Sequence, residues 1–270
     1  MLEARESSKD ALMFSSLIVD IKGTAAWIRL NRPAAANAIN AQMRDELASA
    51  FDAAARNPGV RSIVICGEGK SFAAGSDVRE LGALSPAQSV ELSERIARFH
   101  ACIAQAGKPV IAAVNGWCLG GGFELALACD IRIASQTARF GLPEPTLGLV
   151  AGGGGIPRLA KLAGPGIARH MCLTAEIIDA NQALDRGIVT AVVPVDEIET
   201  AVNRLTDRIA ELAPIAVAQI KRVLESAGDD SLAGAVAAEA QACALCMATD
   251  DYKEGTAAFL EKRKAQFAGH

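Results

Sequence analysis

The first feature of this 270-residue sequence that could do chemistry is a carboxylate that follows three consecutive glycines. Glu124 lies in NGWCLGGGFELALACD (115–130), where its neighbours up to Asp130 are apolar or small. Burying an unpaired carboxylate is costly, because no water remains to solvate the charge. We therefore expect either a chemical role for Glu124 or a buried cationic partner that neutralises it.

The glycines before Glu124 indicate what a chemical role would be. Glycine permits tight turns and lets a ligand approach main-chain NH groups, and the NH groups of a helix's first turn lack partners within the helix. The helix dipole adds to their attraction for negative charge. The NH of Gly121 or Gly122 could thus face a developing anion. The alternative is structural: glycines that let a buried helix pack closely, and Glu124 paired with an arginine.

Two further loops offer similar groups. SFAAGSD (71–77) follows a predicted strand and can present the NH of Ala74, and ARFGLPEPTLG (138–148) places Glu144 between two prolines. Two carboxylates and two backbone donors in a dry cleft are the components of acid–base chemistry beside a stabilised oxyanion. Such chemistry requires no cofactor.

The elements that must position these groups alternate between strands and helices. Strands are predicted at 17–31, as a pair around a turn, and at 61–69, 108–116, 131–135, 138–141 and 189–194. Helices are predicted after Asn40, from Pro86 and after the glycine-rich stretch 147–155, and a loop at 71–81. This alternation implies an α/β fold with mainly parallel pairing and helical crossovers.

Beyond residue 195 the sequence keeps only a helical pattern, which is interrupted at Pro214, near Gly228 and around Asp250. We therefore expect a strand-rich catalytic core at 1–195 and an all-helical region at 196–270. The stretch SLAGAVAAEAQACALCMA (231–248) is too apolar for a freely exposed helix. An interface between subunits is the prediction for this region.

Composition limits the class of protein. Hydrophobic residues make up 51% and charged residues 21% of the chain, as in globular proteins. The formal net charge of -4 argues against nucleic acid as a partner. We see no apolar run of about 20 residues that could span a bilayer and no secretory signal pattern at the start, so a cytoplasmic location without membrane contact is expected.

The cysteines and histidines do not suggest a second kind of site. The seven cysteines are an odd set, mostly within apolar stretches, which fits reduced thiols. Cys243 and Cys246 form a CxxC in a predicted helix, but without a second pair or a nearby histidine we expect no metal there. The three histidines, His100, His170 and His270, are scattered, and we interpret them as surface or structural residues.

Four blocks, taken together and in this order, resemble the enoyl-CoA hydratase/isomerase (crotonase) superfamily. They are LNRPAAANAIN (30–40), SFAAGSD (71–77), NGWCLGGGFELALACD (115–130) and FGLPEPTLGLVAGGGGIPRL (140–159). The resemblance covers about residues 17–267, and FLEKRKAQF (259–267) is similar to the family's closing helix. It implies a crotonase-like spiral of repeated ββα units with a C-terminal helical region through which homotrimers, often paired into hexamers, assemble.

The same resemblance assigns expected roles to individual residues. It implies that the NH groups of Ala74 and Gly121 form the oxyanion hole for a thioester carbonyl, and that Glu124 and Glu144 are the two catalytic carboxylates of the hydratase branch. The segment around Ala34 and Ala36 and the backbone of Ala73–Asp77, including Ala73, Ser76 and Asp77, are expected to contact the substrate's coenzyme A moiety. Gly152 is expected to line the site of the attacking water. Phe259 and Lys262 are expected to reach a neighbouring subunit's ligand. For the side chain of Asp77 we prefer the role of a helix cap.

The activity that the resemblance implies is reversible hydration of a trans-2-enoyl-CoA to a 3-hydroxyacyl-CoA, with coenzyme A as part of the substrate and no separate cofactor. A double-bond isomerase is the alternative within the family, although that branch commonly keeps only the carboxylate matching Glu144. A carnitinyl-CoA-type dehydratase would keep both glutamates. A non-catalytic relative that holds acyl-CoA or RNA is disfavoured by the acidic charge and by the two glutamates.

Overall fold

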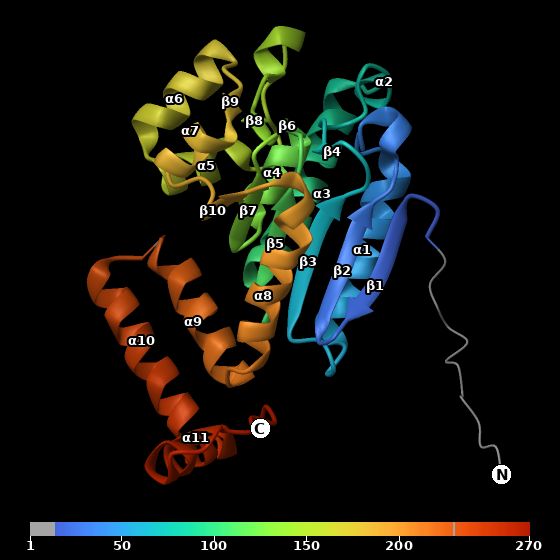
Figure 1. Cartoon of the computed structure of the whole chain (residues 1–270). Helices are drawn as coiled ribbons and strands as arrows, with labels where there is room; N and C mark the ends of the chain where they lie inside the picture. Colours follow the sequence, from blue (N-terminus) through green and yellow to red (C-terminus); the bar gives the residue numbers. More distant parts are fainter. Residues whose placement is uncertain (1–13, 229) are drawn as a thin grey trace, which may run out of the picture.

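A computed structural model describes residues 14–228 and 230–270, which form two β-sheets with helices packed on them and a last group of helices that extends away from the sheets (Figure 1). The larger sheet has the strand order β1 (Leu17–Lys22), β2 (Ala25–Leu30), β3 (Ser62–Gly67), β5 (Val110–Val114), β7 (Ile131–Ser135) and β10 (Ala191–Val193). The smaller sheet has the order β4 (Ser71–Ala73), β6 (Trp117–Leu119), β8 (Arg139–Gly141) and β9 (Ile178–Asp179). Pairing is parallel except between β1 and β2 and between β8 and β9.

A ββα unit repeats along the chain. The units are β3 and β4 with α3 (Pro86–Gln105), β5 and β6 with α4 (Gly121–Ala128), and β7 and β8 with α5 (Gly155–Ala163). In each unit the first strand joins the larger sheet and the second strand joins the smaller one, so the chain winds as a spiral. The predicted fold class is confirmed.

The corner between the two strands of a unit requires a special residue. Gly116, between β5 and β6, has a φ of 53°, which side chains rarely adopt, and a Cβ there would lie 1.8 Å from the carbonyl oxygen of Lys70. Glycine therefore lets the chain pass from one sheet to the other at this point. Because α4 begins only two residues after β6, this corner also sets the position of the helix that carries Glu124.

The remaining described helical segments connect the strands, cover the sheets or, for the last two, pack on other helices beyond the sheets. They are η1 (Pro33–Ala35), α1 (Ala41–Arg56), α2 (Val78–Leu81), η2 (Glu144–Leu147), α6 (Pro165–Thr174), α7 (Ala180–Asp185), η3 (Val195–Glu197), α8 (Ile198–Ala210), α9 (Pro214–Ala227), α10 (Leu232–Met247) and α11 (Asp250–Glu261). Asn40 caps α1 by accepting a hydrogen bond from the NH of Met43 at 3.0 Å, as predicted. The stretch 71–81, predicted as a loop, instead contains β4 and α2.

The central strands β3 and β5 of the larger sheet are buried on both faces, which is why they are nearly continuous apolar runs. On β3, Ile63 and Ile65 face the main core, and Val64 and Cys66 face a second cluster on the other side. Val202 and Ile209 of α8 belong to this second cluster. Helix α8 therefore packs on the sheet, although it lies beyond residue 195.

The helical region beyond α8 breaks where the sequence predicts. Helix α9 begins at Pro214 and α11 begins at Asp250. The closing helix predicted at 259–267 is wrong in extent, because α11 ends at Glu261 and Lys262 takes a left-handed conformation with φ 56°. The tail then returns to the start of α11, where Asp251 accepts hydrogen bonds from the NH groups of Ala268 and Gly269.

Large apolar side chains are exposed along these last helices, among them Ile220, Leu224, Leu232, Val236, Met247, Phe259 and Leu260. In the described parts of the chain no single helix is long and apolar enough to cross a bilayer, although α10 and α11, bent by 77°, pass that test when taken together.

Candidate active site

Glu124 lies in the first turn of α4 and is 4% exposed. Its Oε1 accepts two backbone hydrogen bonds, from the NH of Gly153 at 2.7 Å and from the NH of Gly155 at 3.0 Å. Gly153 precedes α5, and Gly155 is its first residue. The NH groups at the start of α5, which lack partners within that helix, therefore bind a carboxylate from the first turn of α4. The buried charge is therefore compensated mainly by NH groups.

An arginine contributes only indirectly. Arg158 on α5 donates from Nη1 to the carbonyl oxygens of Gly153 and Gly154, each at 3.2 Å, and forms no hydrogen bond with Glu124. Burial raises the pKa of Glu124, and the NH groups of Gly155 and Gly153 and the charge of Arg158 oppose that rise. The structural alternative, a direct buried Glu–Arg pair, is not what the structure shows.

Glu144 begins η2 and supplies the second carboxylate. A Cβ at Gly120, the residue before α4, would lie 2.9 Å from Oε1 of Glu144, so the carboxylate passes close over this glycine. Its Oε2 is buried and has no hydrogen-bond partner within the described chain. Burial and the nearby negative charge of Glu124 raise the pKa of Glu144 to about 6. The two carboxylates are thus close enough to interact.

The glycines at the start of α4 allow it to approach β4 closely. A Cβ at Gly122 would lie 2.3 Å from the carbonyl oxygen of Ala73, and one at Gly121 would lie 2.8 Å from Oγ and 3.3 Å from the backbone nitrogen of Ser76. This close approach brings the backbones of Gly121 and Ser76 side by side. Gly121 is the first residue of the helix, so its NH has no partner within the helix.

The predicted donor Ala74 is wrong. Its NH already donates to the carbonyl oxygen of Ala36 at 3.0 Å. Ser76 instead offers an NH that has no hydrogen-bond partner among the described residues, because the parallel bridge between Ser76 and Ile39 uses the carbonyl of Gly75 and the NH of Asp77. Two unpartnered NH groups, those of Ser76 and Gly121, therefore lie together near the carboxylates.

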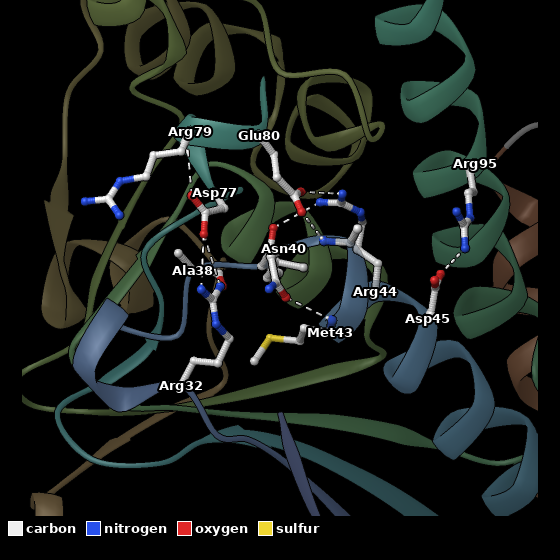
Figure 2. Close-up of polar contacts among 12 residues, drawn as sticks. Arg32, Ala38, Asn40, Met43, Arg44, Asp45, Asp77, Arg79, Glu80 and Arg95 are labelled. Carbon is white, nitrogen blue, oxygen red and sulfur yellow. Dashed lines mark hydrogen bonds and ion pairs between the residues drawn. The ribbon is translucent and has the colours of Figure 1, made fainter. Parts of the chain in front are cut away.

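A group of charged residues surrounds this segment. Figure 2 shows Asp77 between Arg32, with which it forms an ion pair at 3.2 Å, and the backbone NH of Arg79, which it caps at the start of α2. Arg44 of α1 pairs with Glu80 at 2.7 Å. The expected capping role of Asp77 is confirmed, while the guanidinium of Arg79 points away from this cluster in Figure 2.

A cavity of about 280 Å³ is lined by Ser76 and Gly121. Helices α1 and α3 contribute the apolar side chains of Leu47, Ile96 and Phe99 to its walls. Three arginines and one histidine also line it: Arg44, Arg95, Arg98 and His100. The site thus combines donors, carboxylates and an adjoining cavity with an apolar wall.

Comparison with known proteins identifies the family to which this arrangement belongs. The family model described as enoyl-CoA hydratase/isomerase matches residues 20–270. The chain belongs to the enoyl-CoA hydratase/isomerase family. The resemblance that the four sequence blocks suggest is therefore confirmed.

Members of the family match this chain over nearly its whole length. A crotonyl-CoA hydratase from Syntrophomonas wolfei is 40% identical over 257 residues, covering 95% of this chain and 99% of that protein. A 2,3-dehydroadipyl-CoA hydratase from Escherichia coli K12 is 39% identical, covering 94% and 99%. The crystal structure of an enoyl-CoA hydratase from Bacillus anthracis superposes with a TM-score of 0.91 at 35% identity, covering 94% and 100%.

The other residues expected from the family pattern lie in several places. Ala34 is in η1, and Ala36 follows it with φ 48° and accepts the hydrogen bond from Ala74, so these two stretches are joined. Ala73 is buried in β4. Gly152 lies beside Ser93 of α3, since a Cβ there would be 2.5 Å from the serine Oγ. Glu124 is bound by Gly153 and Gly155 of the same loop and not by Gly152.

Phe259 and Lys262 lie far from the carboxylates within one chain. Phe259 is 82% exposed near the end of α11, and Lys262 forms the C-cap of that helix. Figure 1 shows α11 at the end of the molecule opposite α4 and α5. Their expected contact with a neighbouring subunit's ligand stays a prediction.

The site residues that the sequence does not reveal have one feature in common. Their roles depend on contacts between segments that are far apart in the chain. Gly153 and Gly155 belong to a run of four glycines in which the sequence does not distinguish one from another. The NH of Ser76 is free only because of a bridge with Ile39. His100, interpreted as structural, is indeed buried, and its Nδ1 lies 2.8 Å from the carbonyl oxygen of Gly153.

Proposed function

We propose that this chain is an enoyl-CoA hydratase, which reversibly adds water to a trans-2-enoyl-CoA to give a 3-hydroxyacyl-CoA. The observation that carries the proposal is the pair of interacting carboxylates, Glu124 and Glu144, beside the unpartnered NH groups of Ser76 and Gly121. The relatives named crotonyl-CoA hydratase and 2,3-dehydroadipyl-CoA hydratase support the same reaction class.

The two NH groups would bind the thioester carbonyl oxygen. As the oxygen of water attacks Cβ, electrons move from the double bond towards the carbonyl, and negative charge collects on that oxygen in an enolate-like transition state. Donors fixed by the backbone of Ser76 and by the start of α4 need not reorganise at that moment. A donor of this kind contributes roughly 10² to 10³ to the rate.

The carboxylates would take and give the protons of the reaction. In this proposal Glu124 accepts a proton from the attacking water and Glu144 supplies one to Cα. The two NH donors on Oε1 of Glu124 favour its anion, whereas Oε2 of Glu144 has no donor and the pKa of Glu144 is raised to about 6. A proton shared by the pair therefore resides on Glu144, and the pair titrates as a coupled unit.

Coenzyme A enters this proposal as part of the substrate, and no separate cofactor or metal is required. The segment around Ala34 to Ala36, the backbone of Ala73 to Asp77 and the loop at Gly152 are proposed to line its path to the carboxylates. The guanidinium of Arg79, which points away from the surrounding ion pairs, is free to meet a phosphate (Figure 2). The cavity between α1 and α3 is proposed to hold the acyl chain.

Assembly and location complete the proposal. The exposed apolar side chains of α9, α10 and α11 support burial between subunits, in a homotrimer or a hexamer made of two trimers. Such an assembly could bring Phe259 and Lys262 to a neighbouring active site. All seven cysteines are free thiols, which fits the reducing cytoplasm.

The proposal is tested by replacing each carboxylate with its amide. Gln at 124 keeps a carbonyl oxygen that accepts from Gly153 and Gly155, so the loop stays in place while proton transfer is lost. We expect kcat for hydration of crotonyl-CoA to fall by about 10² to 10⁴ in Glu124→Gln and in Glu144→Gln. Loss of crotonyl-CoA absorbance measures the rate, and the control is Glu94→Gln on the exposed face of α3.

Two results would contradict the proposal. Hydration by the unmodified chain could be undetectable for crotonyl-CoA and for longer and dicarboxylic enoyl-CoA substrates. Alternatively, both amide variants could retain the unmodified rate, which would exclude the mechanism with two carboxylates even if hydration occurs.

A further inference from the structure

A buried histidine contacts the loop that binds Glu124, and it lies outside the four sequence blocks of the family pattern. His100, on α3, is 3% exposed, and its Nδ1 lies 2.8 Å from the carbonyl oxygen of Gly153. A carbonyl oxygen can only accept, so Nδ1 carries the hydrogen and donates it. The same glycine donates its own NH to Oε1 of Glu124 at 2.7 Å. Gly153 is thus held on both sides.

The ring of His100 remains a neutral donor over the range in which the enzyme would work. Burial and the charge of Arg158 lower the pKa of His100 to about 4, although the bond to Gly153 opposes this. The charged groups that face this loop are Arg158 from α5 and Glu124 from α4, and the charge of Glu124 acts in turn on Glu144 of η2. Above about pH 5, His100 therefore does not exchange protons with either carboxylate.

The loop needs such an anchor because it has no side chains of its own. Residues 152–155 are four consecutive glycines, which lose the most backbone freedom on ordering. External contacts must fix them, and the carbonyl of Gly153 receives two, from His100 and from Arg158 at 3.2 Å. Helix α3 also packs directly on this point, since a Cβ at Gly153 would lie 2.6 Å from Cγ2 of Ile96.

We propose that His100 is a positioning residue for Glu124, which acts by donating its Nδ1 hydrogen to Gly153. This bond fixes the glycine loop so that the NH groups of Gly153 and Gly155 grip Oε1 of Glu124 and leave Oε2 for the substrate water. The inference rests on the proposed function for its catalytic consequence. The link between His100 and the proton affinity of Glu124 is independent of that function.

The test compares a variant that removes the donor with one that keeps it. His100→Phe retains a ring without the donor, whereas His100→Asn places an amide N–H near the position of Nδ1. Without the bond the loop loosens, the two NH donors weaken, and the pKa of Glu124 rises, because those donors favour the anion. The control Ile103→Val removes buried volume from the same helix and leaves the donor intact.

We expect the pKa of Glu124, followed by NMR of isotope-labelled glutamate carboxyl groups and assigned with Glu124→Gln, to rise by about one unit in His100→Phe. It should stay within about 0.3 units of the unmodified value in His100→Asn and Ile103→Val. For crotonyl-CoA, kcat should fall by about 10-fold to 100-fold in His100→Phe with KM nearly unchanged, and His100→Asn should recover most of it. If the Phe ring prevents folding, His100→Leu gives the same comparison.

The proposal would be overturned if a folded variant without the donor kept the pKa of Glu124 unchanged, or if His100→Asn shifted it as much as His100→Phe. Either result would leave His100 with a packing role only. Because the NMR titration needs no turnover, it decides this question even if the unmodified chain fails to hydrate enoyl-CoA, which would count against the proposed function alone.

Discussion

Two residues of one type, Glu124 and Glu144, have different surroundings at this site. Glu124 is enclosed, and one of its oxygens is fixed by two NH donors. Glu144 is only partly buried, but its Oε2 has no partner and the charge of Glu124 acts on it. Such asymmetry separates the roles of a base and an acid, because the environment, more than the residue type, decides which one holds a proton.

The raised pKa of Glu144 predicts a stability gain when its charge is removed. The folded-state pKa, about 6, lies above the reference value of 4.5, so the folded chain binds more protons between these values and loses stability as pH rises through them. Glu144→Gln should therefore be more stable than the unmodified chain by about 1 kcal/mol near pH 7.5, after allowance for solvent screening of this partly exposed group.

Urea unfolding at one fixed protein concentration measures this gain, which should shrink towards zero near pH 4.5 as both states become protonated. The gain at neutral pH should accompany the loss of activity, as is common for active-site residues. An equal gain at both pH values would show that the carboxyl shape, and not its charge, strains the site.

At the residue scale the sequence identifies side chains better than backbone donors. Glu124 and Glu144 can be located because an acidic residue in an apolar, glycine-rich setting is conspicuous. The predicted donor Ala74 is wrong, because which NH stays free in SFAAGSD depends on contacts with Ala36 and Ile39, more than thirty residues earlier. Local sequence does not encode that register.

At the scale of elements, prediction succeeds where apolar patterns are long. The strands of the buried sheet and the long helices have clear signals, as the Asn40 cap and the break at Pro214 show. The strands β6 and β9 have three and two residues, too few for a periodic pattern. The closing helix ends before residue 267 because Lys262 adopts a left-handed conformation and the tail hydrogen-bonds to Asp251. A helical pattern in the sequence predicts neither feature.

The close approach of α4 to β4 predicts that Gly122 cannot carry a side chain. A Cβ there would lie 2.3 Å from a backbone oxygen, which cannot move without shifting β4 and the NH of Ser76 with it. Gly122→Ala should therefore lower the free energy of unfolding by about 1 to 3 kcal/mol and reduce kcat. Denaturant unfolding and the crotonyl-CoA assay measure both effects.

The matched control is Gly166→Ala in α6, where an added Cβ meets nothing within 4 Å. There the substitution should be neutral or stabilise by about 0.4 to 1 kcal/mol, because alanine has less freedom to lose in the unfolded chain. If the two variants had the same stability and activity, close packing against β4 would not be what requires glycine at position 122.

An ion pair between a buried lysine and a partly exposed aspartate predicts how α9 is held to the core. Nζ of Lys221 lies 2.7 Å from Oδ2 of Asp130 and also donates to the carbonyls of Ile103 and Lys108. Lys221→Met would leave Asp130 without its cation, and should lower the free energy of unfolding by about 1 to 3 kcal/mol, less than for a fully buried pair because Asp130 keeps contact with water. Thermal or urea unfolding is the measurement.

The control is Lys253→Met, because Lys253 and Asp250 form a pair of the same 2.7 Å length with both side chains exposed. We expect a much smaller change there, because water solvates both charges. Adding Asp130→Asn to Lys221→Met should recover part of the loss, since the uncompensated charge is then removed. Equal effects of the two lysine variants would mean that burial of Lys221 has no consequence for stability.

At the scale of the whole molecule, the last three helices suggest that one chain is incomplete. Their exposed apolar side chains include Leu224, Leu232 and Phe259, at 70%, 82% and 82% exposure. Burial between copies would remove this surface from water, with a gain of about 25 cal/mol for each Å². Sedimentation should therefore show an assembly, for which we propose a trimer or hexamer, and a clean monomer at working concentration would contradict it.

If Phe259 completes a neighbour's site, two defective subunits should repair one another. A Phe259→Ala subunit keeps its carboxylates but lacks the aromatic contact, so its assemblies should show KM for crotonyl-CoA raised by several-fold to about 10-fold. A Glu124→Gln subunit is inactive but carries an intact Phe259. In mixed assemblies some intact carboxylate pairs lie beside an intact Phe259, and these sites should have the KM of the unmodified chain.

The experiment unfolds and refolds the two variants together and compares the kinetics with each variant alone. A fraction of turnover should appear with the lower KM only in the mixture, because a contact supplied within one chain could not be transferred to another. The control replaces the inactive partner with the double variant Glu124→Gln/Phe259→Ala, which supplies subunits but no aromatic side chain. If KM in the first mixture equalled that of Phe259→Ala alone, Phe259 would act within its own chain or not at all.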